Sequence, residues 1–130
     1  MKLLFLTTAA IEAGAGLALL GVPTRFAQLL FAAPLEGAVA LTVARVGGMG
    51  LLTLAVAAWF ASHDSQSCAA RGLASAMVLY NLGAALVLGA MGLRSATVGV
   101  ALWPIVLLHA GMAAWCVAQL LRTAYLSKPS

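Results

Sequence analysis

Four polar side chains interrupt the long apolar stretches of this sequence, and each is of a type that takes part in chemistry. The carboxylate is Glu12, the guanidinium Arg45, the amide Asn81 and the imidazole His109, one in each of four stretches. A polar or charged group that is buried without a partner is costly, so such groups normally meet one another. We therefore expect these four side chains to form one buried polar cluster.

The spacing around Glu12 favours an inward face and a cationic partner. Glu12 and Arg45 carry the only opposite charges within the apolar stretches, which predicts an ion pair. Thr8, Glu12 and Gly16 follow at four-residue spacing, so on a helix they would share one face. Two roles are open for the cluster, and they are compatible. It could be a hydrogen-bonded lock that fixes helix packing, or the lining of a cavity for a lipid headgroup, a quinone-like carbonyl, an ion or a proton.

Metal and haem binding fit these residues less well than a hydrogen-bonded lock or a ligand cavity does. Haem needs axial ligands, and His109 has no histidine partner at its depth because His63 lies in a hydrophilic segment. Cys116 follows His109 by seven residues, which on a helix is about 10 Å and too far for one ion. We therefore expect neither a metal nor a haem. An enzyme stays an alternative, with Glu12 and His109 as acid and base on a lipid.

The elements that must position these residues follow from the composition. Hydrophobic residues make up 64% of the chain and charged residues only 8%, whereas about a quarter of a soluble domain is charged. A small soluble domain leaves much of its surface in water, so this composition indicates a lipid environment. The net charge of +4 comes from basic residues that stand singly and form no patch, so we expect no nucleic-acid partner.

Four apolar runs predict an all-α membrane protein. They cover residues 3–22, 38–61, 73–93 and 98–121, and each is close to the roughly 20 residues that cross a bilayer as a helix. The breaks between them are short, which predicts one transmembrane domain over residues 1–130, built as an antiparallel four-helix bundle. The first run begins like a signal peptide but continues to Val22, so we expect a retained span.

The connection after the first run predicts a short interfacial helix over residues 23–33. Pro23 suits the first turn of a helix and Pro34 its end. On that helix the apolar side chains share one face, away from Arg25; they are Phe26, Leu29, Leu30 and Ala33. Such a helix lies in the plane of the membrane interface.

Basic residues at the ends of the spans predict the orientation. The side that holds the N-terminus has Lys2, Arg71, Arg122 and Lys128, and the opposite side has only two basic residues near the spans, Arg25 and Arg94. Cytoplasmic loops carry an excess of Lys and Arg, so we expect both termini in the cytoplasm.

Two segments together carry a resemblance to a known family. GLALLGVPTRFAQLLFAAPL ends the first run in a proline-bearing connector, and ARVGGMGLLTLAVAAW places an arginine and glycines early in the second. In this layout the chain resembles the small four-helix bacterial membrane proteins grouped as DoxX-like. The resemblance implies a bacterial inner-membrane location, and some members are linked to membrane redox assemblies that work with quinones. Arg45 and the glycines after it match the group's second-helix pattern, but no catalytic residue carries over.

The sequence favours a non-enzymatic accessory or binding component over an enzyme. Its polar cluster, Glu12, Arg45, Asn81 and His109, would hold a lipid or quinone-like ligand. The expected partners are membrane lipid and either further copies of the chain or the subunits of a larger membrane complex. A homo-oligomeric transporter or channel is the other alternative, because one chain of this length lacks room for an internal inverted repeat.

Overall fold

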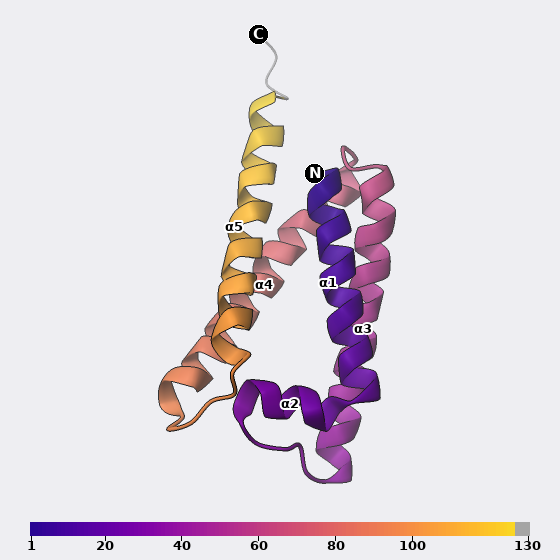
Figure 1. Ribbon diagram of the computed structural model, residues 1–130. Helices are drawn as coiled ribbons and strands as arrows, with labels where there is room; N and C mark the ends of the chain where they lie inside the picture. Colours follow the sequence, from indigo (N-terminus) through magenta and orange to yellow (C-terminus); the bar gives the residue numbers. More distant parts are fainter. Residues whose placement is uncertain (127–130) are drawn as a thin grey trace.

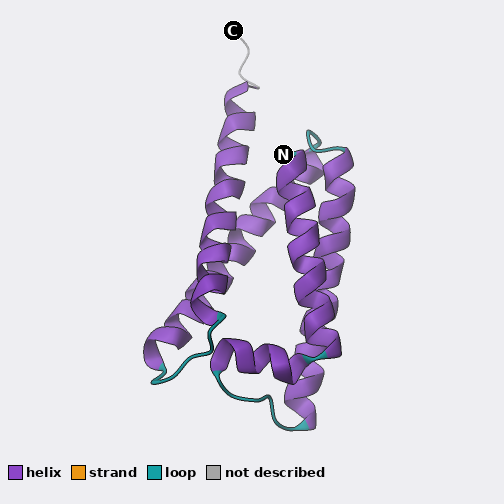
Figure 2. Cartoon of the chain, in the orientation of Figure 1, coloured by secondary structure: helices purple, strands orange, loops and turns teal. Residues whose placement is uncertain are grey.

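The computed structural model describes residues 1–126, which form five helices and no strand (Figures 1 and 2). In chain order they are α1 (Lys2–Gly21), α2 (Pro23–Phe31), α3 (Ala38–His63), α4 (Cys68–Arg94) and α5 (Leu102–Leu126). Four of them, all except α2, are long and apolar enough to cross a membrane. The predicted helical class, the four apolar helices and the short helix after the first are confirmed; Lys128 lies outside the described residues.

Two helix starts differ from the apolar runs, and capping explains one of them. α4 begins at Cys68, five residues before the apolar run, because the Ser67 hydroxyl accepts a hydrogen bond from the Ala70 N–H at 3.1 Å. A serine cap satisfies a backbone donor at a helix start, so the helix can include polar residues there. α5 begins only at Leu102, since the residues before it bind another helix.

That other helix is α2, whose C-terminal end is held by the α4–α5 connection. The Gly99 N–H donates to the Leu30 carbonyl and the Ala101 N–H to the Leu29 carbonyl, each at 2.9 Å. These bonds satisfy carbonyls that a helix end leaves without partners. Gly99 is required by this contact, because a Cβ there would overlap the Leu29 carbonyl group.

The four long helices pack as two pairs, α1 with α3 and α4 with α5. Successive long helices alternate in direction, both ends of the described chain lie at one end of the molecule, and α2 lies crosswise at the other (Figure 1). α1 and α3 approach each other closely at Gly16 and Gly48. A Cβ added to either glycine would lie 2.8 Å from the other's carbonyl oxygen. Small residues at such crossings allow helices to associate closely.

The hydrophobic core joins the two pairs only toward the end that holds the N-terminus. One cluster consists of Phe5, Ala9, Ala58, Ala70 and Ala74, and the other of Leu4, Met77, Met112 and Cys116. α3 and α4 pack far less extensively than the members of each pair, and α4 diverges from α3 toward the end of the molecule that holds α2 (Figure 1). The pairs therefore separate as they approach α2.

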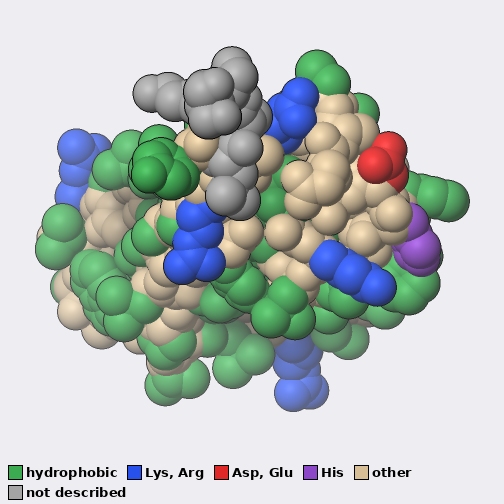
Figure 3. Space-filling model, turned by 90° about the horizontal axis from the view of Figure 1, so that it is seen from above, with side chains coloured by type: hydrophobic (Ala, Val, Ile, Leu, Met, Phe, Trp, Pro, Cys, Tyr) green, Lys and Arg blue, Asp and Glu red, His purple; other side chains and the backbone are tan. Residues whose placement is uncertain are grey.

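The outer surface of the helices is apolar. Leu79 on α4 is 76% exposed and Leu107 on α5 is 70% exposed, and similar residues are exposed on α1 and α3. Seen from the end with the termini, hydrophobic side chains surround the molecule and basic ones stand singly among them (Figure 3). This surface is unlike that of a soluble domain, which rarely exposes large contiguous apolar patches.

Candidate ligand site between the two helix pairs

A cavity of about 430 Å³ lies where the two helix pairs separate. All five helices contribute to its lining, and α2 closes one end with Phe26 and Leu30. The walls are apolar except for three side chains, Glu12, Tyr80 and His109; the others are Ile11, Gly14, Ala15, Leu19, Leu51, Ala84, Leu88, Ile105 and Leu108. The cavity therefore combines a small polar region with a larger apolar one, as ligand pockets usually do.

Glu12 is the most deeply buried charged residue of this site, with 4% of its surface exposed. One carboxylate oxygen accepts a hydrogen bond from the Tyr80 hydroxyl at 3.4 Å. That distance is long, since O–H···O bonds usually measure about 2.7–2.8 Å. No other side chain among residues 1–126 binds the carboxylate, so most of its hydrogen-bonding capacity faces the cavity unused.

His109 and Asn81 form the second half of the polar region. The His109 Nδ1 lies 2.9 Å from the Asn81 Oδ1, and the Asn81 Nδ2 donates to the Met77 carbonyl at 2.8 Å. The His109 ring also meets the Tyr80 ring edge to face, with centroids 5.7 Å apart. Tyr80 thus contacts both Glu12 and His109, and the structure brings three of the four predicted residues into one group.

Arg45 is the exception, and here the structure corrects the sequence prediction. Its side chain is exposed and forms no ion pair with Glu12. Because Gly16 lies opposite Gly48, antiparallel registration places Arg45 roughly 10 Å from the level of Glu12 along the axes. Arg45 instead lies about two turns after the start of α3 at Ala38.

Tyr80 is the site residue that the sequence prediction missed. It immediately precedes Asn81 on α4 and lies near the middle of that helix. Tyrosines of membrane helices are enriched at the two interfaces, so a tyrosine at mid-span is unusual. Its position in the middle of an apolar run is the feature from which the sequence could have indicated a site residue.

Thr8 lies one turn from Glu12, and Thr8, Glu12 and Gly16 are all buried, as their shared spacing predicted. The Thr8 hydroxyl is fully buried and has no hydrogen-bond partner among the described residues. Within residues 1–126, no three His, Cys, Asp or Glu side chains gather closely enough to hold a metal ion.

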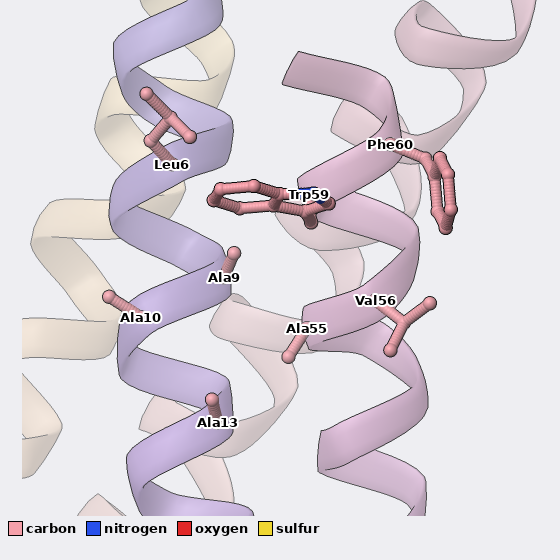
Figure 4. Close-up of a pocket in the computed structure, with 8 residues that line it drawn as sticks. All are labelled: Leu6, Ala9, Ala10, Ala13, Ala55, Val56, Trp59 and Phe60. Carbon is pink, nitrogen blue, oxygen red and sulfur yellow. The ribbon is translucent and has the colours of Figure 1, made fainter. Parts of the chain in front are cut away.

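A second hollow, on the outer face of α1 and α3, offers no comparable chemistry (Figure 4). It has about 420 Å³ and is lined by Leu6, Ala9, Ala10, Ala13, Ala55, Val56, Trp59 and Phe60. Ala9 and Ala55 are buried between the two helices, whereas Trp59 and Phe60 are largely exposed. The indole of Trp59 is the only polar group among these side chains, and nothing else there would select one ligand over another.

Comparison with known proteins assigns this chain to no family and no fold. The chain matches no family model, no curated protein and no solved structure. The candidate site therefore rests on its own geometry, and the DoxX-like resemblance stays a prediction.

Proposed function

We propose that this chain is a multi-pass membrane protein whose inter-pair cavity binds a small amphipathic molecule. The observation that carries the proposal is Glu12, a carboxylate 4% exposed whose one side-chain hydrogen bond is 3.4 Å long. Burial of a polar group is costly unless hydrogen bonds compensate it. A bound polar head at this position would supply the missing bonds.

The membrane assignment draws on the four long apolar helices and their exposed outer leucines. In this arrangement the helices cross the bilayer as an antiparallel bundle and α2 lies at the interface. Lys2, Arg71 and Arg122 occur toward the end with the termini, and Arg25 and Arg94 toward the end with α2. We place the first group in the cytoplasm of a bacterial cell, in its inner membrane, by the positive-inside rule.

The dimensions of the cavity support a small amphipathic ligand. At the roughly 30 Å³ that one water-sized group occupies in a liquid, a volume of about 430 Å³ holds on the order of fourteen such groups. A polar head would lie at Glu12, Tyr80 and His109, and an apolar body would extend toward Phe26 and Leu30. A lipid or a quinone-like molecule, the latter with either a carbonyl or, in its reduced form, a hydroxyl head, has this composition, and the DoxX-like resemblance agrees with the second.

The test compares two Ala→Phe variants that fill different hollows. Ala84 lines the inter-pair cavity, whereas Ala10 lines the α1–α3 groove. The protein is purified in mild detergent, and native mass spectrometry identifies the small molecules that stay bound. We expect the natural chain and Ala10→Phe to retain a ligand that Ala84→Phe loses. Equal retention by all three, or retention by none, would refute a ligand site in this cavity.

An acid–base enzyme is a second candidate, because Glu12 and His109 line one cavity and both contact Tyr80. These groups could move a proton on a bound lipid. Glu12→Gln keeps the size and the acceptor oxygen but removes the acid. Loss of turnover of a retained lipid in Glu12→Gln, with ligand retention unchanged, would establish the enzyme; unchanged turnover would exclude Glu12 as its acid or base.

A further inference from the structure

We infer that the head of the bound molecule is a hydroxyl group, which donates a hydrogen bond to the Nε2 of His109. The inference rests on the proposed function and specifies its ligand. It follows from a chain of hydrogen bonds that begins at a backbone carbonyl outside the cavity lining. Each link in that chain fixes the donor or acceptor role of the next.

The first link fixes the orientation of Asn81. The Met77 carbonyl can only accept, so the Asn81 atom 2.8 Å from it must be the amide nitrogen. The amide oxygen of Asn81 then faces the His109 Nδ1 at 2.9 Å. With the opposite amide orientation, two acceptors would face each other at Met77.

The second link fixes the tautomer of His109. An amide oxygen cannot donate, so the Nδ1 of His109 must carry the proton that forms this bond. In a neutral imidazole, the other nitrogen is then an acceptor. Asn81 is buried and does not line the cavity, whereas His109 does. The ring therefore presents its unprotonated Nε2 on the side away from Asn81, where no described residue donates to it.

The groups around the His109 Nε2 narrow the possible head groups of the ligand to a hydroxyl. The Tyr80 proton is directed to Glu12, so it does not serve His109. A carbonyl head has no proton and would leave the Nε2 unpaired. A hydroxyl donates its one proton to the Nε2, and its oxygen can then accept a hydrogen bond from Glu12 when that carboxyl group is protonated. An ammonium group donates too, but it has no lone pair with which to accept from a protonated Glu12, and the amine probe below tests this alternative.

The test uses three probes of equal size, decan-1-ol, decan-2-one and decylamine, each added at the same mole fraction to detergent-solubilised protein. Apparent affinities come from the rise in unfolding temperature with probe concentration. We expect the alcohol to bind roughly five- to thirty-fold more tightly than the ketone, the factor that 1–2 kcal/mol of lost hydrogen bonding represents. Tighter binding of the ketone or the amine, or equal binding of all three, would overturn the inference.

Variants test whether His109 and Asn81 cause the preference. His109→Leu removes the acceptor, and Asn81→Leu frees the imidazole to take either tautomer, so both should bind alcohol and ketone alike. Asn81→Asp keeps an acceptor for the Nδ1 proton and should keep the preference. A preference that persists in His109→Leu would contradict the assignment. Ala84→Phe separates the two proposals: if it leaves every response unchanged, the cavity is not the site and the proposed function itself fails.

The tautomer is also measurable without any ligand. ¹⁵N-histidine NMR distinguishes Nδ1–H from Nε2–H imidazole and from imidazolium, and His63→Gln assigns the two histidine signals. At about pH 8, above the ordinary histidine pKa of about 6.5, we expect His109 in the Nδ1–H form. In Asn81→Leu the Nε2–H form should appear. An Nε2–H or doubly protonated His109 in the natural chain would overturn the inference regardless of how the variants fold.

Discussion

The contact between Gly16 and Gly48 gives a prediction whose size follows from the structure. In Gly48→Ala the new methyl group would lie 2.8 Å from the Gly16 carbonyl oxygen and 3.0 Å from the Leu19 Cβ. Both neighbours are close to the backbone, so α1 and α3 must move apart. Overpacking of this kind costs about 1–3 kcal/mol. Alanine recovers about 0.5–1 kcal/mol as the better helix former, which leaves a net loss between about 0 and 2.5 kcal/mol and a difference of about 1–3 kcal/mol from an alanine substitution that meets no neighbour.

Gly50→Ala is the matched control on the same helix. A Cβ at Gly50 meets nothing within 4 Å, so only the gain in helix propensity remains and the free energy of unfolding should stay equal or rise. The assay is reversible unfolding in mixed micelles at increasing mole fraction of a denaturing detergent, followed by circular dichroism. If Gly48→Ala is as stable as Gly50→Ala, the two helices do not cross at Gly16 and the derived register is wrong.

Three further predictions test the floor of the cavity, the corrected arginine and the orientation. Gly99→Ala should lower the free energy of unfolding by about 2–3 kcal/mol, because its methyl group displaces the Leu29 carbonyl and disrupts the hydrogen bonds that hold α2. The same detergent unfolding assay measures this loss, and a change under about 0.5 kcal/mol would contradict the contact. Arg45→Ala should change stability by less than about 0.5 kcal/mol, whereas loss of a buried ion pair would cost about 3–5 kcal/mol. Cys68 is exposed and Cys116 buried, so a membrane-impermeant maleimide should label Cys68 only in permeabilised cells; labelling in intact cells would reverse the orientation.

The sequence predicted the elements because their cause is local. An apolar run of about 20 residues must be helical in lipid, since every backbone group has to find its partner within the segment. Pro23 then starts α2 at its first position. The inward faces of Glu12 and Asn81 follow from the same argument, because a strongly polar group in an apolar helix has to turn away from lipid.

The failures concern properties that are not local. Arg45 was grouped with Glu12 by sign of charge, but their separation depends on the register of α1 against α3, which Gly16 and Gly48 set. The cavity depends on how far the helix pairs diverge, and no single segment encodes that angle. It depends instead on the apolar core at one end and on the bonds between Gly99 and α2 at the other.

The distribution of these contacts also bears on whether the polar group is a lock or a pocket. A lock should join the two helix pairs with its strongest bonds. Here the bond of 2.9 Å joins His109 to Asn81 within the α4–α5 pair. Among residues 1–126, the only side-chain hydrogen bond between the pairs is the 3.4 Å contact of Tyr80 with Glu12. The pairs are held together elsewhere, by Phe5, Ala70 and their neighbours and by the backbone of α2. Since the polar group contributes little to that attachment, its position favours the proposed ligand pocket over a lock.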